Sequence, residues 1–216
     1  MKNLNKFNLL WEKGDLRMPL VILIGGAAGT GKTVLAYKLL KDISFCNYLV
    51  TPILRSLLTM FLTKKQNPYI YKHTFDLHRV NGFGEVDAVG LRKNFEKQSK
   101  PIMDGVERFF DFIVSEKQNY IIEGSNLLPK VWKYDKEKMI LIDFYMCVSD
   151  ELVHQTMMGG PTHKRKLTQD QLESVRLLND YTIEKARQYN KRVFEFDVSY
   201  NEVLEYIDQE ISKVIN

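Results

Sequence analysis

An eight-residue glycine-rich segment constrains this chain more than any other feature, and it reads Gly26-Ala27-Ala28-Gly29-Thr30-Gly31-Lys32-Thr33. An apolar run over residues 20–24 comes just before it, and a stretch with helical periodicity follows it. Glycines in this position let the backbone curl until successive amide hydrogens point at phosphate oxygens, and the following helix adds the positive end of its dipole. Strand, loop and helix in this order predict a phosphate-binding loop.

Two side chains of the loop have separate predicted roles. Lys32 is expected to reach the β- and γ-phosphates of a bound nucleotide, and Thr33 to offer its hydroxyl to Mg²⁺. The other predicted nucleotide contacts come from Gly26, Ala27, Ala28, Gly29, Thr30 and Gly31.

The loop fixes the class of ligand but not the reaction, because kinases, motors, GTPases and ATP-driven machines share it. A GTPase of this kind needs an Asn-Lys-x-Asp motif after a late strand, and the sequence has none. A large ATP-driven machine needs more chain than 216 residues. The length fits a small-molecule kinase.

Apolar runs alternate with stretches of helical periodicity along the whole chain, a pattern typical of a parallel sheet covered by helices. We therefore expect a three-layer α/β fold, a five-stranded parallel sheet with helices on both faces and a lid segment. Lys100-Pro101 predicts a break or kink in the third helix, because the residue before a proline avoids the helical region. The expected strands are 20–24, 48–50, 120–122, 139–145 and 192–196, and the expected helices are 32–41, 53–63, 89–114, 149–158, 168–189 and 200–214.

Length and composition favour a single domain over residues 19–216 after an N-terminal extension, 1–18. Turn residues predict an irregular acceptor-side segment at 64–90, and a Gly-Gly-Pro turn followed by a basic run predicts a lid at 157–168.

The net charge of +4 is small for a dedicated nucleic-acid binder. No apolar run approaches the roughly 18 residues of a membrane span, and the first twenty residues hold no apolar core of a signal peptide. We therefore expect a cytoplasmic monomer or homodimer with a small-molecule partner and no nucleic-acid or membrane partner.

A nucleotide-bound Mg²⁺ usually needs a carboxylate at the carboxyl end of a neighbouring strand. Glu123 stands where the strand 120–122 stops and a loop begins. Asp143 also follows an apolar run, but Phe144-Tyr145-Met146 continue the strand beyond it and place it away from the ligand crevice. Glu123 is therefore the preferred candidate.

Motifs beyond the loop occur in a fixed order from residue 20 to residue 200. They are Ile121-Ile122-Glu123-Gly124-Ser125-Asn126-Leu127-Leu128-Pro129, Val148-Ser149-Asp150-Glu151 with His154, Arg176-Leu177-Leu178-Asn179-Asp180-Tyr181 and Lys185-Ala186-Arg187. In these motifs the chain resembles the phosphate-binding-loop kinases related to archaeal 2-phosphoglycerate kinase. The resemblance implies an adenylate-kinase-like core with ATP and Mg²⁺ as donor, and phosphoryl transfer to a small acidic or hydroxylated acceptor.

The chain departs from these kinases on the acceptor side. Their second strand usually ends in Thr-Asp with an arginine three residues further on, whereas here Pro52 follows Thr51 and only Arg55 remains. The loop after Glu123 reads Ser125-Asn126 where those kinases tend to have Val-His. Both departures favour an altered acceptor.

Cations near the transferring phosphoryl group are expected to matter more than a base, because positioning and charge cancellation do most of the work in this reaction. Arg165 in the basic run and Arg176 on the next helix are the candidates for the donor phosphates, since guanidinium matches phosphate bidentately. Arg55, His73 and Asn126 are the candidates for the acceptor. Ser149 is expected to cap the helix that carries His154, and we interpret that helix start as local structure.

Three functions fit these observations. The preferred one is an ATP-dependent kinase acting on a small acidic or phosphorylated metabolite of 2-phosphoglycerate type. The alternatives are a nucleoside or nucleotide kinase, which aromatic residues in 69–83 would serve, and a regulatory protein that binds ATP without transferring its phosphoryl group, which Pro52 favours.

Overall fold

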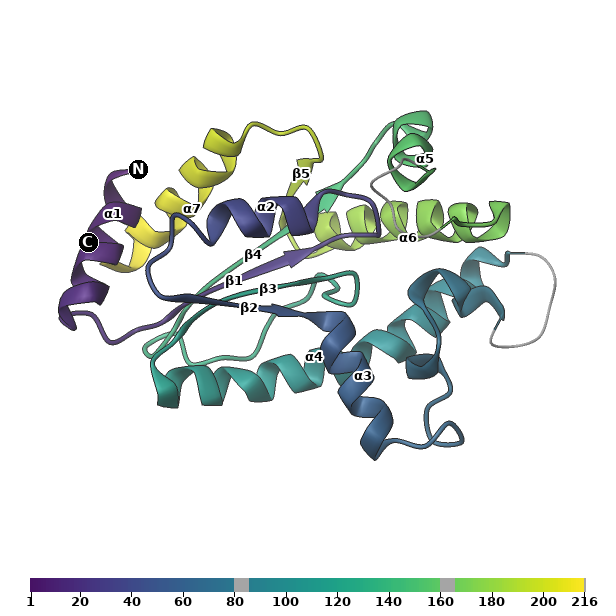
Figure 1. Ribbon diagram of the computed structural model, residues 1–216, viewed down its shortest axis with the longest axis horizontal. Helices are drawn as coiled ribbons and strands as arrows, with labels where there is room; N and C mark the ends of the chain where they lie inside the picture. Colours follow the sequence, from purple (N-terminus) through teal and green to yellow (C-terminus); the bar gives the residue numbers. More distant parts are fainter. Residues whose placement is uncertain (80–85, 160–165, 216) are drawn as a thin grey trace.

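The five predicted strands form one sheet in the computed structural model, which describes residues 1–79, 86–159 and 166–215. Every neighbouring pair runs parallel, in the order β2-β3-β1-β4-β5 (Figure 1). The strands are β1 (Leu20–Gly25), β2 (Cys46–Val50), β3 (Asn119–Gly124), β4 (Ile140–Cys147) and β5 (Arg192–Glu195). The predicted fold class is confirmed.

Helices cover both faces of this sheet. On one face lie α1 (Lys2–Lys13), α2 (Lys32–Leu39) and α7 (Tyr200–Ile215), and on the other lie α3 (Thr51–Phe61), α4 (Ala88–Glu116) and α6 (Gln169–Gln188) (Figure 1). The other elements in the described ranges are α5 (Glu151–Gly159) and two 3-10 turns, η1 (Tyr69–Tyr71) and η2 (Thr74–Arg79).

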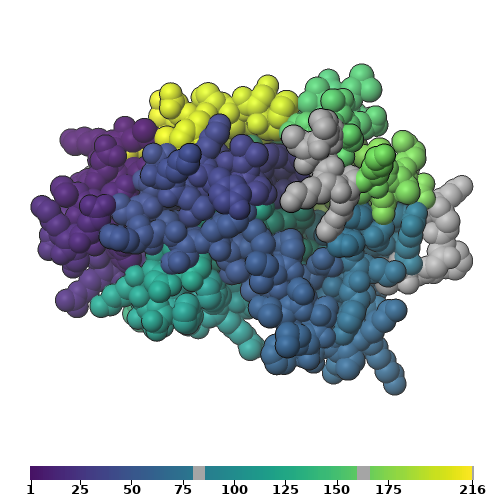
Figure 2. Space-filling view, in the orientation of Figure 1, coloured from purple at the N-terminus to yellow at the C-terminus, as the bar shows by residue number. Residues whose placement is uncertain are grey.

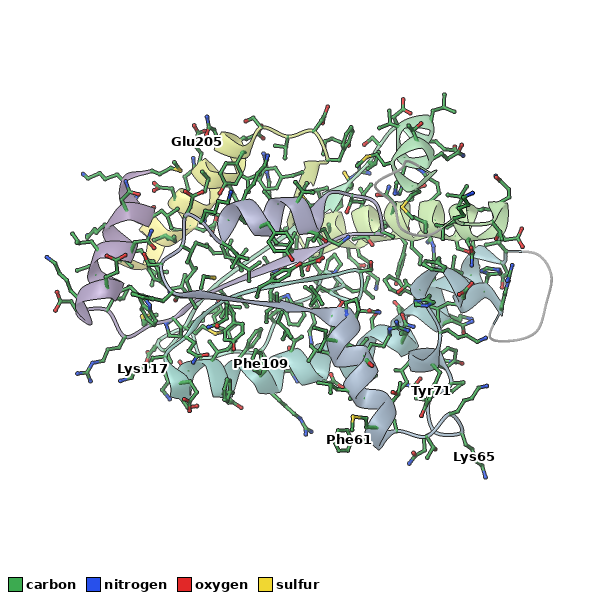
Figure 3. The ribbon with its side chains drawn as sticks, viewed as in Figure 1. Phe61, Lys65, Tyr71, Phe109, Lys117 and Glu205 are labelled. Carbon is green, nitrogen blue, oxygen red and sulfur yellow. The ribbon has the colours of Figure 1, made fainter. Side chains whose placement is uncertain are left out.

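Strand β1 shows why helices pack on both faces of the sheet, because its apolar side chains project from both of its sides. Leu20, Ile22 and Ile24 pack with α2 and α7, whereas Val21 and Leu23 pack with α4. Figure 3 shows Phe109 of α4 on one side of the sheet and Glu205 of α7 on the other. A strand buried on both faces is what a parallel sheet between helix layers requires.

The break predicted at Lys100-Pro101 is absent, because α4 continues through Pro101. A proline inside a helix leaves the carbonyl four residues earlier without its usual donor. Here that carbonyl belongs to Lys97, and it accepts a hydrogen bond from Asn67 Nδ2 at 3.5 Å. The helix therefore has no break at this proline, and a neighbouring segment supplies a donor for the freed carbonyl.

The first helix is anchored to the last one. Asp208 of α7 accepts hydrogen bonds from the backbone nitrogens of Asn3 and Leu4 at 2.8 and 2.9 Å and from Asn3 Nδ2 at 2.9 Å. Leu4 and Phe7 are buried in the core that α2 and α7 form. In Figure 2 this helix, in purple, covers one end of the molecule beside the yellow α7.

None of the helices in the described part of the chain combines the length and the apolar composition of a membrane span.

Candidate active site

The phosphate-binding loop stands at the carboxyl edge of the sheet, between its two halves. Strand β1 lies between β3 and β4, and its last residue, Gly25, pairs with Gly124 and with Tyr145. In an open parallel sheet the ligand crevice forms at the carboxyl ends of the strands, where the connections from neighbouring strands leave toward opposite sides.

Glycine is required within the loop for two different reasons. Gly26 has a φ of 138°, and a Cβ there would collide with the carbonyl oxygen of Met146. Gly31 has a φ of 81° and stands directly before α2. The loop therefore wraps tightly onto β4 and then delivers the amide groups at the start of α2 to the same crevice.

Lys32 lies inside this loop. Its side chain is buried, and its ammonium donates to the carbonyl of Ala27 and, at 3.3 Å, to Thr30 Oγ1. Burial lowers the pKa of Lys32, and the negative charge of Glu123 acts in the opposite direction. A desolvated cation that contacts only neutral oxygens gains from an incoming phosphate, so this ammonium suits a phosphate ligand.

The carboxylate predicted at the end of β3 meets the loop. Thr33 Oγ1 donates to Glu123 Oε1 at 2.8 Å, and the Tyr48 hydroxyl donates to the same oxygen at 2.9 Å. Burial and the Glu123 charge raise the pKa of Tyr48, so its hydroxyl keeps its proton and stays a donor. Sequence reasoning brought Thr33 and Glu123 together but missed Tyr48, whose signal is an aromatic residue two positions before the end of the edge strand.

These oxygen groups fit Mg²⁺. The ion prefers oxygen ligands and is usually held by one or two protein groups together with phosphate oxygens. Within the described residues no group of three or more His, Cys, Asp and Glu side chains could hold a metal unaided. Thr33 and Glu123 therefore suit an ion that arrives with a nucleotide.

The competing carboxylate is engaged elsewhere. Asp143 pairs with Leu23 in the middle of the sheet, forms an ion pair with Lys191 at 2.9 Å and accepts from the Tyr145 hydroxyl at 3.3 Å. Its predicted position within the strand agrees with the structure.

Helix α5 supports the loop from outside, which the sequence interpretation did not include. His154 Nε2 lies 2.8 Å from the carbonyl oxygen of Ala28, and Met158, one turn later, is buried against Ala27 and next to Gly29. Burial lowers the pKa of His154, which favours a neutral ring that donates from Nε2. The available signal was the spacing of four between these two residues, which places them on one face of a helix.

The start of α5 differs from the prediction. Asp150 rather than Ser149 caps the helix, because Asp150 Oδ1 accepts from the backbone nitrogen of Val153 at 2.9 Å. The Ser149 hydroxyl instead donates to Glu195, since the loop passes directly over the end of β5.

The two arginines proposed for the donor phosphates have different outcomes. Arg176 donates to the carbonyls of Val148 and Ser149 at 2.6 and 2.9 Å and pairs with Asp180 at 3.0 Å. It thus holds the segment between β4 and α5, and its contact with phosphates stays a prediction. Arg165 lies outside the described residues, as does half of the predicted lid, residues 160–165.

The three predicted acceptor residues line one cavity of about 190 Å³ beside the loop. Arg55 Nη1 donates to the carbonyls of Ile70 and, at short range, Lys72. The His73 ring stacks on Phe75 with centroids 5.2 Å apart. Asn126 Nδ2 donates to Gln98 and Ser99 of α4. The cavity is lined by Ala28, Thr51, Pro52, Arg55, His73, Thr74, Phe75, Ser125 and Asn126.

A second cavity, of about 200 Å³, opens on the other side of the loop. Its residues come from separate elements and it has no single sequence motif, so sequence reasoning did not find it. Its mainly apolar wall suits the flat face of a nucleobase. The lining residues are Gly31, Val34, Leu35, Lys38, Met146, Met157, Phe196, Val198 and Tyr200.

The fold is similar to that of a kinase of known structure. In the structure of shikimate kinase from Acinetobacter baumannii in complex with shikimate, the same fold recurs with a TM-score of 0.53 and 12% identity, over 94% of this chain and 99% of that one. No protein-family profile matches the chain.

In sequence, the chain is similar to 2-phosphoglycerate kinases. It is 26% identical to that of Methanocaldococcus jannaschii over 192 residues and 28% identical to that of Pyrococcus furiosus over 193 residues, in each case over 87% of this chain. The expected resemblance is thereby confirmed. The matches cover 62% and 63% of those relatives, so the chain spans less than two thirds of their length.

Proposed function

We propose that the protein is an ATP-dependent phosphotransferase whose acceptor is a small acidic or phosphorylated metabolite. One observation carries the choice of acceptor: the cavity beside the phosphate-binding loop is lined by Arg55 and His73 and, among the described residues, by no carboxylate. A pocket of this charge attracts anions and disfavours cationic acceptors. The names of the similar proteins from Methanocaldococcus and Pyrococcus point to the same chemical class.

The two cavities support transfer across the loop. Ala28 lines the acceptor cavity and Gly31 lines the apolar one, so a nucleotide with its base in the latter would extend its phosphates along the loop toward the former. Such an arrangement brings donor and acceptor oxygens toward the line that phosphoryl transfer requires.

The chain's own residues would divide the work between binding and charge cancellation. The loop amides would bind phosphate oxygens, and Lys32 would place its cation against the charge that develops on the transferring group. Thr33 and Glu123 would hold Mg²⁺, whose charge, when bound, offsets that of the phosphates. Tyr48 would keep Glu123 oriented from the edge strand.

The missing carboxylate at Pro52 is compatible with this mechanism. Pro52 occupies the first turn of α3, where a proline is well tolerated. Because phosphoryl transfer depends mainly on positioning, a base at this position is not essential, and Arg55 one turn later can orient an anionic acceptor.

A nucleoside acceptor is the second candidate, since the stacked rings of His73 and Phe75 would accept a base. The cavity volume favours the smaller acceptor, because about 190 Å³ is below the roughly 300 Å³ at which pockets for larger ligands begin. A regulatory protein that binds ATP without transfer is the third candidate, favoured by Pro52.

The test is ADP release with Mg-ATP against a panel of acceptors, with the Lys32→Ala variant as the blank. The panel contains 2-phosphoglycerate, other phosphorylated acids, unphosphorylated hydroxy acids and nucleosides. Stimulation by one phosphorylated or carboxylated acid, lost in Lys32→Ala and weakened in Arg55→Gln, is the expected result. Stimulation by nucleosides alone would establish the second candidate, and tight ATP binding without any stimulation would favour the third.

A further inference from the structure

A third cavity, of about 360 Å³, lies away from the two cavities of the site and shares no lining residue with either. It is formed by one face of α4, the end of α6 and the segment that follows β3. Its lining residues are Lys93, Glu96, Lys97, Lys100, Met103, Leu128, Pro129, Lys130, Lys185 and Tyr189.

Lysines dominate this cavity, with five of them against one lining carboxylate. Three have a carboxylate partner: Lys100 pairs with Asp104 at 2.7 Å, Lys130 with Glu107 at 2.8 Å and Lys185 with Glu96 at 3.3 Å. Five ammonium groups less three carboxylates leave two positive charges. The matching ligand therefore carries two negative charges.

The floor between these charges is apolar. Met103 of α4 and Leu128 with Pro129 of the following loop form it, and Tyr189 adds an aromatic edge. A simple inorganic ion would leave this surface exposed to water, whereas an apolar group attached to the anion would bury it. The cavity thus fits a molecule that has both an anionic group and an apolar group.

Helix α4 connects this cavity to the acceptor cavity through Gln98, which is fully buried. Gln98 Nε2 donates to the carbonyls of Tyr69 and Lys72 at 2.8 and 2.9 Å, and its Oε1 accepts from Asn126 at 2.9 Å and from Thr74 at 3.2 Å. These bonds fix the wall of the acceptor cavity.

Lys97 provides a second connection, since its ammonium lies 3.2 Å from the Tyr69 hydroxyl. We propose that the lysine cavity is a regulatory site for a small organic dianion with an apolar part, and that its occupation alters the Tyr69–Thr74 wall through Lys97 and Gln98.

Phenyl phosphate is the probe, because it joins a dianion to an apolar ring. Its binding is measured by calorimetry on the full chain with saturating MgADP, which occupies the phosphate-binding loop. The double variant Lys93→Gln/Lys100→Gln removes two exposed charges of the cavity, and Lys41→Gln/Lys136→Gln removes two exposed charges elsewhere. Neither variant alters a buried contact, so both should fold as the unmodified chain does.

We expect one bound phenyl phosphate, weakened at least about fivefold in the cavity variant and unchanged in the control variant. Inorganic phosphate and benzyl alcohol should each bind more weakly than phenyl phosphate. Equal binding to the two variants, or equal binding of inorganic and phenyl phosphate, would overturn the site.

Hydrogen exchange tests the connection to the acceptor wall. Phenyl phosphate should change the protection of amides 69–74 in the unmodified chain and not in the cavity variant, and unchanged exchange in both would overturn the regulatory role. Because neither assay needs turnover, failure here is distinguishable from failure of the proposed kinase activity.

Discussion

Neutralising Glu123 or Asp143 offers the sharpest test of the site, because the structure predicts an effect on nucleotide binding for the first residue and on stability for the second. Glu123→Gln keeps the shape of the side chain but removes its charge. Each hydrogen bond to a charged group contributes about 1.5–3 kcal/mol and each neutral one about 0.5–1.5 kcal/mol. The difference between a charged and a neutral acceptor applies to both bonds, so the contributions of the Thr33 and Tyr48 bonds fall by about 2–3 kcal/mol together.

We expect the carboxylate to contribute a similar free energy to the metal-bound nucleotide, which corresponds to a fall in affinity of about 30- to 150-fold in the variant. Asp143→Asn instead removes the partner of Lys191, in a pair whose side chains are 12% and 20% exposed. We expect it to lower the free energy of unfolding by about 1–3 kcal/mol and to leave nucleotide binding nearly unchanged.

The assay is calorimetric titration of ATP with Mg²⁺ and with EDTA, accompanied by urea denaturation of each variant. In Glu123→Gln the gain that Mg²⁺ gives to ATP affinity should disappear, while affinity in EDTA stays similar. If Asp143→Asn weakened Mg-ATP binding more than Glu123→Gln did, the assignment of the metal-side carboxylate would be refuted.

Three further predictions concern the loop and its supports. Lys32→Ala should abolish phosphoryl transfer without unfolding the chain, and full residual activity would remove the phosphate-binding assignment. Tyr48→Phe should raise the Mg²⁺ concentration needed for half-maximal ATP binding about three- to tenfold. The control variant Tyr37→Phe, which alters an exposed neighbouring ring, should leave this concentration unchanged. Equal effects of the two variants would exclude a specific role of the Tyr48 hydroxyl. Burial lowers the pKa of His154 in the folded chain, so the unfolded chain binds a proton at this ring more readily than the folded chain does. The free energy of unfolding therefore has its full value above about pH 6.5 and falls as the pH is lowered toward the folded pKa. His154→Gln should flatten the dependence of the unfolding free energy between about pH 7 and about pH 5, and an unchanged slope would contradict the buried neutral ring.

The sheet and the loop were predictable because their signals are local. An apolar run followed by the glycine pattern determines strand, loop and helix over 20–39, and a carboxylate directly after another apolar run identifies the crevice edge. Glu123 was distinguished from Asp143 by where each strand ends, which can be read along the chain.

The remaining features depend on contacts between distant segments. Tyr48 reaches Glu123 only because β2 pairs with β3 in a register that sets Tyr48 opposite Ile121, and a sequence alone does not give that register. The donor to the Lys97 carbonyl, Asn67, likewise lies 30 positions earlier in the chain. Rules that consider only residues close together in the sequence cannot identify either contact.

The contact between Asp208 and the start of α1 has a consequence for how the molecule opens. Both chain ends lie at the amino edge of the sheet (Figure 1), and Lys6 Nζ also donates to the carbonyl of Ile215 at 3.0 Å. Detaching α1 would remove three bonds from Asp208, on the helix whose Tyr206 packs edge-on against Phe144 and Phe194. We therefore expect α1 and α7 to open together as one cooperative unit, so that amides of both helices exchange hydrogen with a shared free energy of opening.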